Sequence, residues 1–192
     1  VVLIHLANLE GFHARLIALN PIDGKNLNRV FPGQANGSLS EQIAYFLTEH
    51  VIANTDYLID IHAGSANQTL LPHVYSPVMG QTALDARTLA FAKSLEIPHI
   101  VLYDERPRDP AHSVSYPNTA QTRGKPGLTL EVGQMGGRSD ADRDRIVQAC
   151  LQALRHLGML PPSAQPSAQP SAQPSAQPSA HYDAPVLYRK VV

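Results

Sequence analysis

One apolar stretch, residues 56–62 (DYLIDIH), constrains the fold of this chain more than any other. Its β-branched and aromatic residues predict a buried β-strand, which ends where a turn of small residues follows. Because side chains alternate along a strand, Leu58, Asp60 and His62 share one face. Ligands of α/β sheets bind just beyond the carboxyl ends of the strands, and His62 lies at such an end.

Strand and helix patterns alternate along the rest of the chain. We expect further strands over 1–6, 97–102 and 127–132, and helices from Ser38 to Val51, over 83–95 and over 140–157. This alternation predicts an α/β fold with a mixed, mainly parallel sheet and helices on both faces. The first helix has Ser38 as its N-cap and Glu41 three residues later. Its predicted buried stripe is Ile43, Phe46, Leu47 and Val51.

The segments between these elements are predicted to be loops. Residues 7–12 predict a loop, and residues 13–37 are rich in Asn-Pro, Asp-Gly and Asn-Gly turn signals. A long structured loop of this kind is often functional. Residues 103–125, polar and rich in Pro and Arg, match no pattern well, although their composition would allow a lid.

The C-terminal part of the chain carries a different signal. Copies of Pro-Ser-Ala-Gln follow one another from Pro162, and a proline in every copy excludes a helix or a central strand. We expect residues 161–180 to be a semi-extended linker, and prefer this to a proline-motif ligand because no aromatic or basic residue accompanies the repeat. Residues 181–192 predict the first strand of a truncated C-terminal β segment.

Composition narrows the class of protein. With 43% hydrophobic residues among 192, the chain can build a substantial core. Fifteen Lys+Arg against sixteen Asp+Glu argue against a nucleic-acid face, and no run is long and apolar enough to span a membrane. A single cysteine, Cys150, excludes an intrachain disulfide and a cysteine-rich zinc site. It fits a reducing, cytoplasmic compartment and packing within the last helix.

Four clusters carry side chains suited to chemistry, and residues 12–15 (FHAR) are the weakest of them taken alone. Asn28 and Arg29 lie in the turn-rich loop 23–33, where a guanidinium and an amide can hold a carboxylate; an isolated pair of this kind would more often be a solvated loop. His62 can be a metal ligand, a general base or a core residue, and alone the core role is favoured. Glu131 ends an apolar strand, so it needs a partner or a raised pKa, and a plain salt bridge remains an alternative to a general base.

Four segments together resemble the succinylglutamate desuccinylase/aspartoacylase family of the zinc carboxypeptidase clan. They are residues 8–15 (NLEGFHAR), 23–33 (DGKNLNRVFPG), 56–62 (DYLIDIH) and 129–133 (TLEVG), in this order. The resemblance covers about residues 1–160. It implies a mixed sheet between helices, one zinc held by an H-x-x-E pair and a later histidine, and hydrolysis of an amide in an N-acyl amino acid or a similar small carboxylate.

Carried over by position, the resemblance implies a role for five residues. His62 is the later zinc ligand, and Glu131 is the general base that activates water. Asn28 and Arg29 bind the substrate carboxylate, with Arg15 as a further substrate-binding arginine. These residues are expected to meet around one pocket. We add Asp60 as a residue that orients His62, with a plain hydrogen-bonding role as the alternative.

The chain departs from the family pattern at the metal. No histidine in it is followed by a glutamate three residues later. A catalytic zinc normally has three protein ligands, so His62 alone should bind zinc poorly. We therefore expect residues 1–160 to be a partial zinc-hydrolase domain that lacks the family's N-terminal zinc motif and C-terminal β domain. The alternative is a metal-free, catalytically inactive module that keeps the carboxylate clamp.

Overall fold

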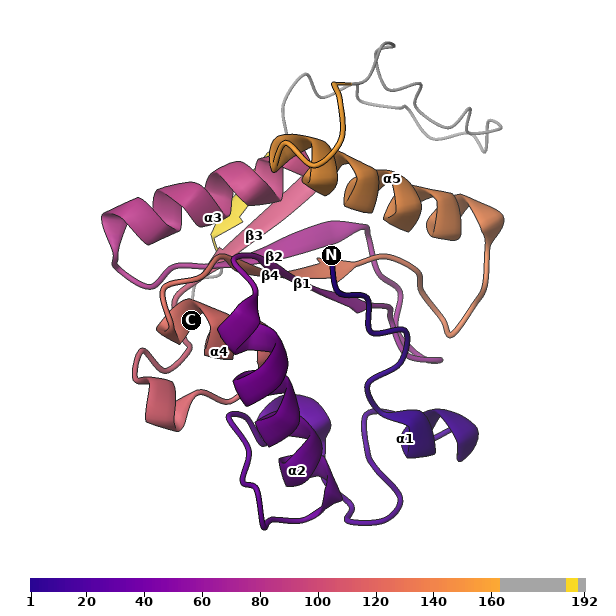
Figure 1. Ribbon diagram of the computed structural model, residues 1–192. Coiled ribbons are helices and arrows are strands. Elements are labelled where there is room, and N and C mark those ends of the chain that lie inside the picture. The colour runs from indigo at the N-terminus through magenta and orange to yellow at the C-terminus, as the bar shows by residue number, and fades with distance from the viewer. Residues whose placement is uncertain (163–185, 190–192) are drawn as a thin grey trace. The chain divides into compact units, whose positions relative to one another are not determined.

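The strands of the protein form one sheet. The computed structural model describes residues 1–162 and 186–189 (Figure 1). Within them, the sheet has five strands in the order β1-β4-β2-β3-β5. Their bounds are β1 Leu58–His62, β2 His73–Pro77, β3 His99–Tyr103, β4 Gly127–Glu131 and β5 Val186–Arg189.

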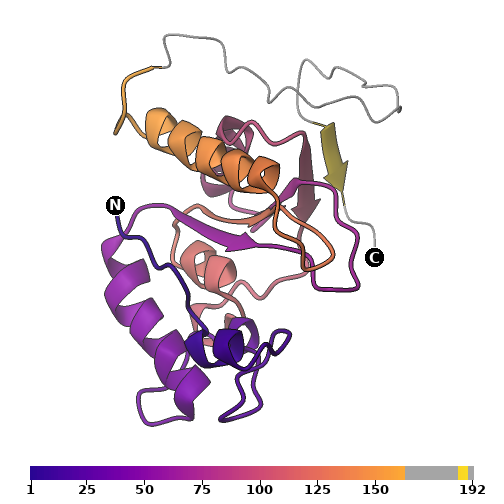
Figure 2. The same ribbon diagram turned by 90° about the vertical axis from the view of Figure 1, so that its right-hand side faces the viewer.

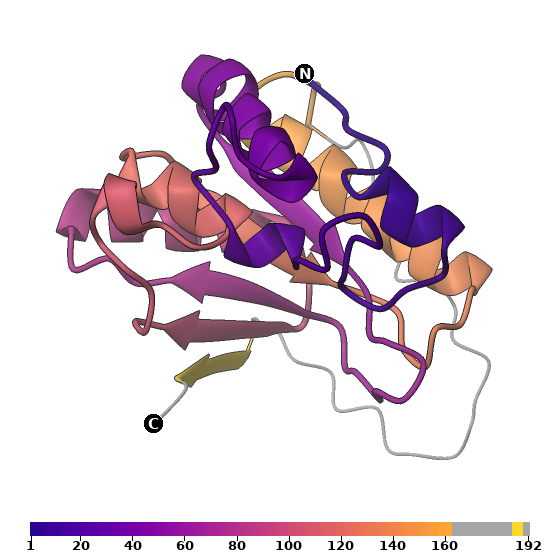
Figure 3. The same cartoon turned by 90° about the horizontal axis from the view of Figure 1, so that it is seen from below.

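The last strand, β5, completes one edge of the sheet. It runs parallel to β3, with Val186 opposite His99, and Figure 2 shows the two arrows together. Figure 3 shows β2, β3 and β5 side by side in that order. The predicted α/β fold with a mainly parallel sheet is confirmed. A strand was expected within 181–192, and the rest of that segment and nearly all of the predicted linker lie outside the described residues.

The helices follow the predicted order, with two additions. Their bounds are α1 Leu9–His13, α2 Leu39–Phe46, α3 Thr82–Ser94, α4 Tyr116–Thr122 and α5 Asp140–His156. The helices predicted over 83–95 and 140–157 are confirmed as α3 and α5, whereas α1 and α4 were not expected. Beyond Phe46, α2 continues as a π turn to Val51 and a 3-10 turn to Asn54. No helix in the described residues is long and apolar enough to cross a bilayer.

Contacts between residues divide the described chain into two compact units. Unit 1 comprises residues 1–60, 76–88 and 103–129, and unit 2 comprises the remaining described residues.

The core of unit 1 forms around the ring of Tyr116. Leu27, Phe31, Ala44 and Leu47 make one buried cluster, and Ile52, Leu58 and Ala120 make another; Tyr116 packs against both. Its ring stacks on that of Phe31, with centroids 5.3 Å apart and planes at 28°. This packing joins α2, α4 and the loop before α2 (Figure 1).

The start of α2 is held by two carboxylates. Glu41 accepts a hydrogen bond from the N–H of Ser38 at 2.8 Å, which confirms the predicted N-cap pair. Asp23 accepts from the N–H of Ser40 at 2.7 Å and from its hydroxyl at 2.9 Å. Burial alone would raise the pKa of Asp23, but hydrogen bonds from Ser40 and Lys25 outweigh it and lower the pKa from 3.8 to about 2.

Replacing Asp23 with asparagine should therefore weaken unit 1 in a pH-dependent way. A carboxyl whose pKa is lower in the folded state stabilises that state above its unfolded pKa, and the effect disappears as the pH falls through the folded pKa. We expect the variant to lose about 1–2 kcal/mol of unfolding free energy at pH 7. The difference from wild type should shrink between pH 3.8 and about 2. Urea unfolding across this range measures it, and an equal difference at pH 2 and pH 7 would contradict the assignment.

Two predictions for the N-terminal segment are wrong. Residues 1–6 form no strand, and Val1 and Leu3 are 92% and 71% exposed. Apolar β-branched residues form a strand only when a neighbouring strand pairs with them, and no such pairing occurs here. Residues 7–12, predicted as a loop, contain most of α1, because the Asn8 side chain accepts from the N–H of Gly11 at 3.1 Å and caps a short helix.

The predicted burial of Phe46 is also wrong, since its side chain is 56% exposed. The buried stripe instead runs through Ser40, Ala44, Leu47 and Thr48. These positions follow the ordinary helical spacing i, i+4, i+7 and i+8, which leaves Phe46 on the outer face. There its ring lies beside that of His50, with centroids 4.9 Å apart.

Within residues 103–125, α4 is a buried helix made mostly of polar residues. Asn118, Thr119 and Gln121 are fully buried, and their side chains bond protein groups: the amide nitrogens of Asn118 and Gln121 donate to the carbonyls of Pro107 and Gly127. Buried polar side chains of this kind interrupt the apolar period on which helix prediction depends. Strand β2 was not predicted for the same reason, because the buried Ser76 interrupts its apolar pattern.

Unit 2 has an aliphatic core with one aromatic ring. Val74, Phe91, Ile100, Leu130 and Val132 are all nearly or fully buried. On α5, Ala149 and Ala153 are buried. Cys150 on the same helix is half-buried, and burial raises the pKa of its thiol, as expected for a packing role.

Candidate active site

The loop that carries Asn28 and Arg29 is ordered by its own side chains. Leu27–Arg29 forms a 3-10 turn, and the Asn26 side chain caps it by accepting from the N–H of Asn28 at 2.9 Å. Leu27 is buried in the core of unit 1, which fixes the base of the turn. Neighbouring residues on this turn can therefore present side chains in different directions.

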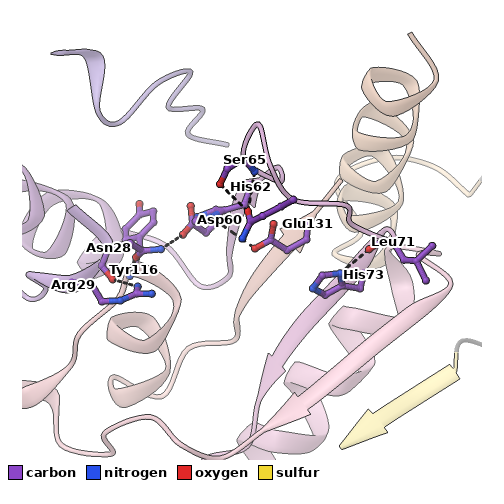
Figure 4. Close-up of polar contacts among 10 residues, drawn as sticks. Asn28, Arg29, Asp60, His62, Ser65, Leu71, His73, Tyr116 and Glu131 are labelled. Atoms are coloured by element: carbon purple, nitrogen blue, oxygen red, sulfur yellow. Dashed lines mark hydrogen bonds and ion pairs between the residues drawn. The ribbon is translucent and has the colours of Figure 1, made fainter. Parts of the chain in front are cut away.

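The amide of Asn28 connects this loop to two other elements of unit 1. Its nitrogen donates to Asp60 on β1 at 3.0 Å, and its oxygen accepts from the backbone N–H of Tyr116 at the start of α4 at 2.7 Å. Figure 4 shows the Asn28 side chain directed toward Asp60. The structure thus brings Asn28 and Asp60 together, which sequence spacing could not predict.

Arg29 has a different environment. Its side chain is exposed, and its Nη1 donates to the backbone carbonyl of Asn28 at 2.6 Å. The main-chain carbonyl is an uncharged acceptor, so it does not offset the positive charge of the guanidinium. That charge can therefore attract an anionic ligand.

Tyr116 is the residue of this cluster that the sequence did not reveal. Burial raises the pKa of its phenol to about 12, and the negative charge of Asp60 adds to the effect. The phenol is therefore protonated at neutral pH. Pro117 in the first turn of α4 is the signal that could have located the helix start beside Tyr116.

His62 and Glu131 form a second cluster, in unit 2. The Nδ1 atom of His62 lies 3.9 Å from Oε1 of Glu131, and Figure 4 shows the two side chains directed toward each other. They are 36% and 16% exposed, respectively. Each ends its strand, and the N–H of Val132 donates to the carbonyl of His62 at 3.1 Å, which fixes the two strand ends beside each other.

The turns that follow these two residues are joined by hydrogen bonds. The N–H of Gly64 donates to the carbonyl of Gly133 at 3.0 Å, and the N–H of Met135 donates to that of Gln68 at 2.8 Å. Gly133 has φ +100°, which glycine adopts readily and other residues rarely do. The small residues that follow His62 and Glu131 thus let the two turns approach closely.

A complete zinc site is not formed by the described residues. A catalytic zinc needs three protein ligands, and within residues 1–162 and 186–189 no three His, Cys, Asp or Glu side chains converge. His62 and Glu131 supply one imidazole and one carboxylate. The donor set of this part of the chain therefore does not by itself fit a catalytic zinc.

The remaining predicted site residue is Arg15. It follows the short helix α1, with φ +55°, and its side chain is exposed. In the described residues, no hydrogen bond or ion pair joins it to Asn28, Arg29 or Asp60, so the structure does not bring it into that cluster. Its substrate-binding role stays a prediction, as does the expectation that all these residues share one pocket.

Comparison with known proteins identifies the family. The model of the succinylglutamate desuccinylase/aspartoacylase catalytic domain matches residues 1–157. The chain is similar to an N-alpha-acetyl-L-2,4-diaminobutyric acid deacetylase of Halomonas elongata, with 28% identity over 147 residues, which are 76% of this chain and 42% of the relative.

Solved structures agree with this match. A succinylglutamate desuccinylase/aspartoacylase from Rhodobacter sphaeroides has a TM-score of 0.71 at 26% identity, covering 79% of this chain and 43% of that protein. The product-bound ectoine utilization protein EutE (DoeB) from Ruegeria pomeroyi has a TM-score of 0.73 at 26% identity, covering 82% and 47%. The chain thus spans less than half the length of these relatives. It belongs to the succinylglutamate desuccinylase/aspartoacylase family.

Proposed function

We propose that this protein takes part in hydrolysing the amide bond of N-acyl amino acids or similar small carboxylates. The observation that carries the proposal is the partly buried carboxylate of Glu131, 3.9 Å from His62 at the ends of β4 and β1. A carboxylate that is mostly withdrawn from water and lies beside an imidazole is suited to accept a proton. Membership in a family whose relatives include a deacetylase and desuccinylases supports the same reaction class.

In the proposed reaction, Glu131 transfers a proton. Its carboxylate removes a proton from a water molecule as the water oxygen bonds to the acyl carbon. The same group then returns the proton to the amine nitrogen as the carbon–nitrogen bond breaks. The products are a carboxylic acid and a free amine, so atoms and charge balance. Such general acid–base catalysis contributes about 10²–10⁴-fold to a rate.

Substrate recognition is assigned to Arg29, an exposed arginine of unit 1. An arginine offers a rigid fork of donors to a carboxylate and keeps its charge at every physiological pH. We assign the carboxylate of the amino acid to Arg29. N-acetyl-2,4-diaminobutyrate is the first substrate to test, because the Halomonas relative is named for it.

Zinc dependence is a separate part of the proposal, with His62 as one ligand. Because the described residues do not complete a donor set, we expect the purified 192-residue chain to bind zinc weakly, and His62→Ala to abolish this binding. Titration calorimetry with zinc measures both. His112→Ala is the matched control, since His112 is 77% exposed and pairs only with Asp109 among the described residues. Tight binding that survives His62→Ala would remove His62 from the metal site.

A second candidate is a metal-free module that binds carboxylates and does not hydrolyse them. The incomplete donor set among the described residues favours it, and the Arg29 turn is held by a protein side chain, that of Asn26. Under this alternative, N-acetyl-2,4-diaminobutyrate binds the chain but is not consumed, and added zinc changes neither result. Product formation that depends on zinc and on Glu131 would exclude it.

A further inference from the structure

The two side chains of the predicted carboxylate clamp have unlike surroundings in unit 1. Arg29 is exposed, whereas the amide of Asn28 is half-buried and bonds protein on both sides: its nitrogen donates to Asp60 at 3.0 Å and its oxygen accepts from Tyr116 N–H at 2.7 Å. A donor to a carboxylate and an acceptor from a backbone amide together fix which way the amide is turned. The Asn28 side chain is therefore oriented by protein groups before any ligand arrives.

The backbone of Asn28 extends this constraint to its neighbour. Its carbonyl accepts from Nη1 of Arg29 at 2.6 Å, and its N–H is held by the Asn26 side chain. Asp60 thus holds the Asn28 side chain, which fixes the peptide that in turn holds the guanidinium. Since a free arginine side chain has many rotamers, holding it in one of them lowers the entropy cost of binding an anion.

We propose that Asp60 and Asn28 are positioning residues for Arg29, and that Arg29 makes the direct contact with the substrate carboxylate. This rests on the proposed function and goes beyond it, because it assigns Asp60 a role and gives Asn28 a role other than substrate contact. Asp60 acts here through Asn28, across 32 positions of the chain.

A charge exchange separates this role from direct contact. In Asn28→Asp the new carboxylate faces the carboxylate of Asp60, so the contact becomes repulsive. In the double variant Asn28→Asp/Asp60→Asn, an amide at position 60 can donate to a carboxylate at position 28, and that carboxylate can still accept from Tyr116 N–H. The hydrogen bond between the side chains at positions 28 and 60 is restored, and residue 60 is now its donor. If residue 28 touched the substrate carboxylate, the exchanged pair would instead repel it.

The experiment measures how strongly the chain prefers a carboxylate ligand. The dissociation constants of N-acetyl-2,4-diaminobutyrate and of its carboxamide are determined by calorimetry for each variant, and their ratio is the readout. We expect wild type to prefer the acid by about 10–100-fold, and Arg29→Ala to bring the ratio near one. Asn28→Asp should lower this ratio about tenfold, and the double variant should bring it back to within about threefold of the wild-type ratio. Asp140→Asn, which removes an exposed charge on α5, is the control and should match wild type.

A second readout does not depend on the ligand. The Hε–Nε NMR signal of Arg29 reports whether the guanidinium is held in one position. We expect it to broaden or shift in Asn28→Asp and to return in the double variant, with thermal unfolding showing that each variant is folded.

The outcomes distinguish the two proposals. The positioning role would be overturned if the double variant preferred the acid as weakly as Asn28→Asp alone does. It would also be overturned if the Arg29 signal were the same in every variant. Equal affinity of wild type for acid and carboxamide would count against the carboxylate-binding function, while the Arg29 signal would still decide for or against the link from Asp60.

Discussion

Replacing Glu131 with glutamine is expected to lower the kcat of amide hydrolysis by about 10²–10⁴-fold while leaving the fold intact. Glutamine has the size and shape of glutamate, so the ends of β1 and β4 should pack as before. It cannot accept a proton from water, which is the step assigned to Glu131. KM should change little, because the lost interaction belongs to the transition state rather than to substrate binding.

This prediction is measured by amine release from N-acetyl-2,4-diaminobutyrate in the catalytically competent protein. Glu49→Gln is the matched control, because Glu49 is exposed on the π turn and takes no part in the proposed reaction. Circular dichroism and thermal unfolding establish that Glu131→Gln is folded. Activity within a few-fold of wild type would remove Glu131 from the reaction and leave its proximity to His62 as a structural contact.

The second large effect concerns stability. Gly33→Ala is expected to lower the free energy of unfolding by more than about 3 kcal/mol. Gly33 has φ +86°, and a Cβ atom there would lie 2.1 Å from the backbone nitrogen of Tyr45 and 2.4 Å from the carbonyl oxygen of Glu41. Both atoms belong to the backbone of α2, which cannot move away locally. The substitution must therefore displace the loop 23–33 from the helix, or displace the helix itself.

Gly24→Ala provides the comparison that isolates the clash. Gly24 also has positive φ, +65°, but a Cβ atom there would have nothing within 4 Å. It should cost only the conformational strain of a non-glycine residue, about 1 kcal/mol. Urea unfolding of both variants measures the difference. Similar losses in the two would show that the approach of Gly33 to α2 is not rigid.

Local signals were sufficient for much of the fold. The capping pair Ser38 and Glu41 defines the start of α2 within a few residues of sequence, and the charged first turn of α5 and the apolar pattern around Cys150 do the same over 140–156. The strand ending in His62 was predictable from its own β-branched residues, although it is less buried than expected, since Ile61 is 42% exposed. In each case the information is contained within one element, so no knowledge of its neighbours is needed.

Elements that depend on partners were mispredicted. Residues 1–6 have the composition of a strand, but no strand within residues 1–162 and 186–189 pairs with them. In α4, buried Asn118 and Gln121 look like surface residues until Pro107 and Gly127 supply their hydrogen-bond partners. Phe46 was expected inside because the buried stripe of this helix includes two polar residues, Ser40 and Thr48, which the sequence pattern placed at the surface.

For the candidate site too, one part could be predicted from the sequence and another part required the structure. From the sequence alone came the identity of the chemical groups, namely the imidazole of His62, the carboxylate of Glu131 and the guanidinium of Arg29, since these are properties of residue types and of their order. Only the tertiary structure decided which side chains lie in contact. Asn28 bonds Asp60, 32 residues away in the chain, and His62 lies beside Glu131 at the neighbouring ends of β1 and β4. Such pairings depend on backbone hydrogen bonds between segments far apart in the chain, and the spacing of residues within a segment carries no record of them.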